Sequence, residues 1–138
     1  MTYDGPIPKM SNTARRQDGA YFALYDNFHI LGSDSQYRLT VTGYSGTAGK
    51  FGGWDMSFNN GWVFSTFDHD LPSHCAQTQR SGWWHMDLLK PVRICNGANL
   101  NGVWAGDSQE AGEDHVFWAP LSGRHSLTRV TMSVRRVR

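Results

Sequence analysis

The sequence is poor in cysteine, in proline and in long apolar runs, and it has almost no excess of one charge. It holds two cysteines and five prolines in 138 residues, and its 13 basic and 12 acidic side chains leave a net charge of +1. So balanced a charge gives no broad attraction to nucleic acid or to an anionic membrane. No apolar run approaches the ~20 residues that a membrane-spanning helix needs. Neither a nucleic-acid partner nor a membrane span is therefore expected.

Aromatic residues and glycine are abundant. The chain has six tryptophans, seven phenylalanines, five tyrosines and fifteen glycines. Its length is sufficient for one domain with a hydrophobic core. This composition favours an aromatic core surrounded by irregular loops over a helix bundle.

Both cysteines lie in one loop-rich segment. Cys75 and Cys95 bracket the pair Trp83-Trp84. Two cysteines in such a segment suggest one disulfide that closes a binding loop. By the loop-closure relation, a bridge of this span contributes roughly 3 kcal/mol to stability. Because a paired-cysteine module belongs in an oxidising compartment, we expect a secreted, extracellular protein.

Three segments have the composition or the alternation of β-strands. Residues 21–31 are rich in β-forming side chains, and the segments 37–41 and 130–134 alternate between apolar and polar residues. Period-2 alternation predicts half-buried strands. The glycine-rich residues 43–53 predict a loop.

Two segments lack such a pattern. Residues 1–17 contain two prolines and no clear periodicity, and are interpreted as a tail or linker, with pairing along a sheet edge as the alternative. Residues 68–123, approximately, show no sustained period of either kind. They predict a loop-built region, where function tends to reside.

Four motif blocks follow one another in a fixed order. They are Tyr37-Arg38-Leu39 with the run Gly43–Gly49, Phe64-Ser65-Thr66 with Asp68-His69-Asp70, the cysteine block with Gly82-Trp83-Trp84 and Asn99-Leu100-Asn101-Gly102, and the final Thr131-Met132-Ser133. Together they resemble the fibrinogen C-terminal domain, the module shared by fibrinogen, ficolins and tachylectins. The resemblance spans about residues 18–135.

The resemblance implies an α+β fold with a central antiparallel sheet, short helices and a large loop-built binding subdomain. It places the last strand in the middle of the sheet. The family domain is normally longer at its N-terminus, so residues 18–138 are interpreted as a partial domain. No signal peptide is visible at Met1. We therefore expect the chain to be a fragment or mature piece of a secreted protein.

In the resemblance, the acidic loop before the first cysteine is the family's calcium site. Ca²⁺ takes carboxylate and carbonyl oxygens from one tight loop. The ligands would be the side chains of Asp68 and Asp70 and the carbonyls of Pro72 and His74. Because the loop is short here and lacks a third acidic residue, a solvated acidic turn is the alternative.

The resemblance also places a ligand pocket at the second cysteine, where the family's peptide bond before that cysteine is typically cis. The residues expected to line it are Ile94, Cys95, Asn96, Gly112, Glu113 and His115. Asn96 stands where the family has a histidine, Gln79 where it has a tyrosine, and Gly112-Glu113 where it has an aromatic wall. Polar contacts are therefore expected to replace stacking. The alternative for Asn96 is a turn-forming role.

The function implied by the resemblance is non-catalytic recognition in innate immunity. The partners would be microbial carbohydrates such as acetylated sugars, peptidoglycan or lipopolysaccharide, and several copies would be needed for useful avidity, which makes a homo-oligomer an option. The alternative is protein–protein adhesion or fibrin-like capture of a peptide. No phosphate-binding loop, nucleophile elbow or recognised zinc spacing occurs, so an enzyme is not expected.

Overall fold

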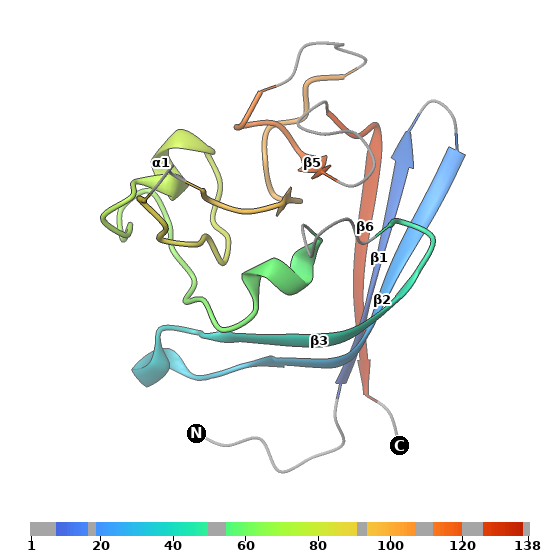
Figure 1. Ribbon diagram of the computed structural model, residues 1–138, viewed down its shortest axis with the longest axis horizontal. Helices are drawn as coiled ribbons and strands as arrows, with labels where there is room; N and C mark the ends of the chain where they lie inside the picture. Colours follow the sequence, from blue (N-terminus) through green and yellow to red (C-terminus); the bar gives the residue numbers. More distant parts are fainter. Residues whose placement is uncertain are drawn as a thin grey trace.

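The computed structural model describes residues 8–16, 19–49, 55–90, 94–106, 112–119 and 126–136. Four long strands form one antiparallel sheet (Figure 1). They are β1 (Pro8–Arg16), β2 (Gly19–Ile30), β3 (Leu39–Gly46) and β6 (Arg129–Arg136). The order across the sheet is β3-β2-β1-β6.

The remaining elements are short. A two-stranded ladder joins β4 (Ala98–Asn99) to β5 (Phe117–Trp118). Helices within the described residues include the 3-10 turns η1 (Ser33–Ser35) and η2 (Met56–Asn59) and the single turn α1 (Cys75–Thr78). None of the helices in the described ranges is long and apolar enough to cross a bilayer. The expected α+β fold, with one antiparallel sheet and few helices, is confirmed.

Strand β1 corrects the expectation of an N-terminal tail. Ser11 lies opposite Leu24 of β2 on one side and opposite Ser133 of β6 on the other. Residues 8–16 are therefore an interior strand, and the tail interpretation is wrong for them. The ladder is made by backbone groups, so a segment without side-chain alternation can still pair on both edges. Residues 1–7 and 17 lie outside the described part of the chain.

Strand β6 was expected in the middle of the sheet, and this position is wrong. β6 pairs with β1 alone and forms an edge of the described sheet. The alternation still has the predicted effect at Val130 and Met132, which are partly buried and pack against the core. Val134 is 52% exposed and faces solvent.

Strand β3 begins and ends later than its sequence pattern indicates. Leu39 and Val41 are buried as predicted, whereas Tyr37 lies before the strand with a φ of 56°. The strand continues to Gly46, so the loop interpretation is wrong for residues 43–46. A Cβ at Gly46, where φ is 140°, would clash with the Phe22 carbonyl oxygen of β2. Glycine here permits close strand pairing instead of breaking the strand.

The aromatic core lies between the sheet and the irregular segments. In Figure 1 the described segments between β3 and β6 gather against one face of the bent sheet, and α1 lies at the end away from β6. Trp83 is fully buried and Trp84 is 7% exposed. The ring of Trp84 meets Phe28 and Phe64 edge to face, with centroids 6.5 and 5.2 Å apart. The core interpretation of the tryptophan pair is confirmed.

A buried hydrogen bond joins the sheet to η2. The Tyr25 hydroxyl donates to Oδ1 of Asp55 at 2.7 Å, and the same carboxylate oxygen accepts from the Ser57 amide at 2.8 Å. Burial, with the adjacent Asp55 carboxylate, raises the pKa of Tyr25 far above its usual value. The hydroxyl therefore stays protonated and holds the first turn of η2 on strand β2.

Candidate ligand-binding site

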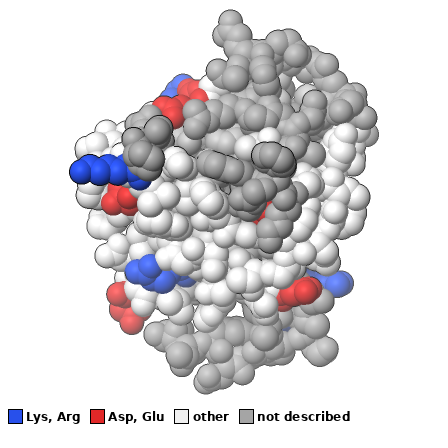
Figure 2. All heavy atoms as spheres, viewed as in Figure 1, with Lys and Arg blue, Asp and Glu red and all other residues white. Residues whose placement is uncertain are grey.

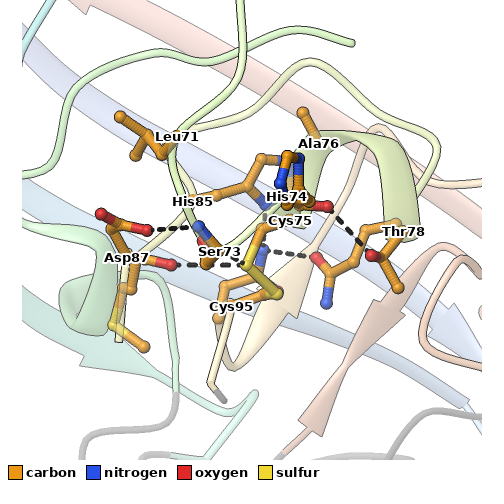
Figure 3. The surroundings of a disulfide bond; sticks show 12 residues. Leu71, Ser73, His74, Cys75, Ala76, Thr78, His85, Asp87 and Cys95 are labelled. Carbon is orange, nitrogen blue, oxygen red and sulfur yellow. Dashed lines mark hydrogen bonds between the residues drawn. A yellow bond between two sulfur atoms is a disulfide. The ribbon is translucent and has the colours of Figure 1, made fainter. Parts of the chain in front are cut away.

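The two cysteines form the expected disulfide. Their sulfur atoms are 2.06 Å apart and their Cα atoms 5.5 Å apart, and both residues are buried. Figure 3 shows the bridge between α1 and the Cys95 segment, with Ser73 beside it. The Ser73 amide donates to Oδ1 of Asp87 at 2.8 Å, and its hydroxyl contacts the Cys75 sulfur at 3.2 Å. The bridge therefore fixes the irregular segments on both sides of the tryptophan pair.

The carboxylate of Asp70 caps α1. Its Oδ1 accepts from the amides of Leu71 and Ala76 at 2.8 and 3.2 Å, and its Oδ2 accepts from the amide of Gln77 at 3.0 Å. Two of these amides belong to the first turn of α1, where backbone N–H groups lack partners within the helix. Asp70 thus accepts hydrogen bonds from backbone amides that would otherwise lack a partner within the helix.

The other expected calcium ligands are also engaged or exposed. Oδ1 of Asp68 accepts from the Thr66 hydroxyl at 2.7 Å, and this bond lowers the pKa of Asp68. The carbonyl of His74 accepts from the amide and hydroxyl of Thr78. No group of three or more metal-ligating His, Cys, Asp or Glu side chains occurs in the part of the chain that the structure describes. Asp68, Asp70 and His74 thus take part in the hydrogen bonds of this turn, and calcium binding stays a prediction.

Asn96 points into the protein. It is 3% exposed, and its Nδ2 donates to Oε1 of Gln79 at 2.7 Å and lies 2.9 Å from Nδ1 of His85. Gln79 and His85 are themselves fully buried. Asn96 therefore belongs to the floor beneath the surface and does not itself line an open pocket.

His85 is held as the neutral imidazole. Its Nε2 lies 3.0 Å from the Ser81 carbonyl oxygen, which can only accept, so Nε2 carries the proton and Nδ1 accepts from Asn96. Burial lowers the pKa of His85, although the bond to the Ser81 carbonyl acts in the opposite direction. The hydroxyl of Ser81 continues the chain of contacts by donating to Oδ1 of Asn99 at 2.7 Å.

This buried polar cluster consists of Gln79, Ser81, His85, Asn96 and Asn99. Two of its amide atoms have no hydrogen-bond partner within the described protein, namely the acceptor Oδ1 of Asn96 and the donor Nε2 of Gln79. Buried polar atoms are usually paired, and each exception calls for a physical explanation. A water, or any other polar molecule that offers one donor and one acceptor, would satisfy both.

The turn of residues 112–115 packs onto this cluster from the surface. Asn99 links the two, because its Nδ2 donates at 3.3 Å both to the carbonyl of Gln79 and to the carbonyl of His115. A Cβ at Gly102 would clash with the same His115 carbonyl. The turn of residues 112–115 is partly exposed, and the His115 side chain is 16% exposed. The expected pocket residues thus separate into a buried part at Cys95 and Asn96 and a surface part at 112–115.

The expected segment at Ile94 is part of a backbone bridge. The Ile94 amide donates to the Leu88 carbonyl at 3.0 Å, and the Cys95 carbonyl accepts from the Met86 amide at 2.7 Å. His85 and Asn99 were not expected from the sequence as parts of the site. Their polar character next to the tryptophan pair and within the Asn-Leu-Asn-Gly turn is the signal that could have indicated them.

Residues 9–137 match the profile of the family described as fibrinogen beta and gamma chains, C-terminal globular domain. The chain belongs to this family. The resemblance found in its motifs is therefore confirmed, and the matched region includes all of β1 except Pro8. The sheet, the disulfide and the buried tryptophan pair of this fibrinogen-like domain are those described above.

Relatives of the fibrinogen-like domain have varied names. The domain is 34% identical over 126 residues to Techylectin-5A of Tachypleus tridentatus. The aligned residues cover 88% of this chain and 39% of that protein. The domain is 36% identical over 119 residues to Angiopoietin-related protein 6 of Homo sapiens, covering 82% and 23%. Tenascin-N of Homo sapiens is 36% identical over 118 residues. The chain thus spans two-fifths or less of the length of these relatives.

Solved structures agree with this assignment. The fibrinogen-like globe domain of human ANGPTL6 superposes with a TM-score of 0.82 at 30% identity, covering 98% of this chain and 59% of that one. A lamprey fibrin D-dimer, solved with the peptide ligand Gly-His-Arg-Pro-amide, has a TM-score of 0.72 at 23% identity and shares the fold.

Proposed function

We propose that this fibrinogen-like domain is a secreted, non-catalytic recognition module that binds acetylated glycans of microbial surfaces in innate defence. Its similarity to Techylectin-5A, whose name denotes a lectin, supports this function. The similarity alone does not choose the ligand, because one fold can carry different binding sites. The choice has to come from the residues of the site.

The observation that carries the proposal is the pair of unsatisfied amide atoms beside the disulfide. Oδ1 of Asn96 needs a donor and Nε2 of Gln79 needs an acceptor. An acetamido group supplies one N–H and one carbonyl. Because both protein atoms are buried, binding there requires a local opening, and the surface turn tied to the cluster is the one at residues 112–115.

The nearly balanced charge of the chain, +1 overall, agrees with a local polar site better than with a broad ionic one. On the face shown in Figure 2, acidic and basic atoms form small separate groups among neutral atoms. Recognition would then depend on hydrogen bonds within one site. Single sites of this kind bind weakly, so binding to a cell surface would use several copies of the domain.

The test is capture of the disulfide-bonded chain by killed bacteria, with N-acetylglucosamine and glucose as competitors. We expect N-acetylglucosamine to release the protein at lower concentration than glucose, because only the former has an acetamido group. Glu113→Ala should weaken capture with little change in melting temperature, and Asp34→Ala on η1 is the matched control. If the chain instead binds a partner protein and neither sugar releases it, the result would support the alternative of adhesion or peptide capture.

A further inference from the structure

A surface cavity of about 440 Å³ lies outside the residues expected to line the ligand pocket. One wall is the turn of residues 66–68, and the other is formed by parts of residues 76–82. Its volume falls within the ~300–1,000 Å³ typical of small-molecule sites. The two walls are joined at their base, because the Ser65 amide donates to the Trp83 carbonyl at 2.9 Å.

Phe67 provides an aromatic surface at this cavity. Its side chain is 75% exposed, although most large aromatic residues of the described chain are buried or half-buried. The turn that carries it is closed by two backbone hydrogen bonds of 3.1 Å between Thr66 and His69. Phe67 is thus presented to solvent by a closed turn. The negative face of an aromatic ring attracts the slightly positive C–H groups that one face of a pyranose presents.

Two polar side chains stand at the rim near Phe67. The Asp68 carboxylate is oriented by the Thr66 hydroxyl, which donates to its Oδ1 at 2.7 Å. The side chain of Gln77 is exposed, and its Nε2 reaches the Phe67 carbonyl only at 3.4 Å. A carboxylate that accepts and an amide that both donates and accepts are suitable partners for neighbouring hydroxyl groups.

Arg80 completes the rim. Its backbone has a φ of 49°, a left-handed conformation that is costly outside glycine and concentrates at functional sites. Its Nη1 lies 3.5 Å from Oδ2 of Asp114, longer than the ~2.7–2.9 Å of a strong charged pair. One guanidinium beside the carboxylates of Asp68 and Asp114 gives no excess of positive charge. The rim therefore favours a neutral ligand over an anionic one.

We propose that this cavity is a second binding site, for the ring of a neutral pyranose that stacks on Phe67 and donates its hydroxyls to Asp68 and Gln77. The choice of a sugar among small polar ring compounds rests on the proposed function. The position of the site does not, because it follows from the cavity and its exposed ring. Two sites on one domain would let it hold two units of a single glycan chain.

The experiment follows backbone amide signals of the isotope-labelled, disulfide-bonded chain during titration with glucose and with N-acetylglucosamine. Both sugars should shift the amides of residues 66–68 and 76–82. Phe67→Ala should weaken the affinity measured from these shifts about three- to tenfold. Phe67→Tyr should restore it. Phe22→Ala, which removes an exposed ring from strand β2, is the matched control and should leave it unchanged.

Shifts at residues 112–115 and in the buried polar cluster that leave the amides of residues 66–68 unmoved would overturn the second site and leave the proposed function standing. Unchanged affinity in Phe67→Ala would overturn it as well. If neither sugar shifts any amide, the second site and the proposed function both fail.

Discussion

At Asn96 the chain keeps the backbone position of an expected pocket residue but directs the side chain inward. The amide is bonded to Gln79 and lies beside His85, and both of those residues have no exposed surface. A side chain so placed stabilises the fold as well as the site.

Asn96→Ala should therefore lower the free energy of unfolding by about 1–3 kcal/mol, because it leaves the buried side-chain oxygen Oε1 of Gln79 without its donor. Urea unfolding of the variant and the parent measures the difference. Gln77→Ala, which truncates an exposed amide on the neighbouring α1, is the control and should change stability little. Equal stability of Asn96→Ala and the parent would show that the cluster does not form as described.

The buried His85 should make stability depend on pH. Its folded pKa is lowered by burial, so the unfolded state binds the proton more readily. The stabilisation is complete above the unfolded pKa of ~6.5 and is lost as the pH falls from there toward the folded pKa. Unfolding measured between pH 7.5 and 5 should show this decline, and His85→Gln should reduce the slope. An exposed histidine change, His74→Gln, should leave the slope as it is.

Among the elements, α1 depends on one carboxylate that lies outside it. Asp70→Ala removes the acceptor of three backbone amides and should destabilise the domain by about 0.5–2 kcal/mol. In EDTA the loss reflects the capping bonds alone, because they need no metal, and a larger loss in calcium would indicate calcium binding through Asp70. Thermal melting in millimolar CaCl₂ and in EDTA gives the comparison.

The calcium prediction is decided by calorimetric titration of the same proteins. If the loop binds Ca²⁺, the parent gives a binding heat that both Asp68→Ala and Asp70→Ala abolish. The absence of heat and of any thermal shift in the parent would mean that Asp70 serves the helix alone.

Strand β6 should tolerate substitution of Val134 but not of Val130 or Met132. Val130 and Met132 pack against the core, whereas Val134 is 52% exposed. A fully buried large side chain contributes ~1.5–3 kcal/mol, so Met132→Ser should cost about half of that or more, and Val134→Ser close to nothing. Deleting the residues after Thr128 should prevent folding, since it removes the whole β1–β6 ladder. A truncated chain that melts like the parent would refute the pairing.

The elements also show what could be predicted from the sequence. Leu39 and Val41 were assigned correctly because alternation reports directly on which face of a strand is buried. β1 could not be found in this way, since its place depends on backbone pairing with β2 and β6. The inward turn of Asn96 and the cavity at Phe67 depend on residues brought together from distant turns. Local sequence patterns carry no information about contacts between residues that lie far apart in the chain.

For the whole molecule, the disulfide should matter most for the irregular half. The bridge joins residues 20 apart in sequence and closes a loop that carries both core tryptophans. Cys95→Ser should lower stability by roughly 3 kcal/mol. Hydrogen exchange should then rise more in residues 82–102 than in β1 and β2. A uniform rise across both regions would mean that the sheet and the loop-built part unfold as one unit.

The pairing of β1 with β6 also sets the order in which the strands of the sheet can pair during synthesis. β1 and β2 are neighbours in the chain and can form a hairpin as soon as both have left the ribosome. The partner on the other side of β1 is synthesised only after the entire loop-built part. Until then one edge of β1 is open, and long-range pairing of this kind is slow. Both cysteines are synthesised within that interval, so the disulfide can form while the sheet is still incomplete, and a chaperone that shields the open edge of β1 would raise the yield of folded protein.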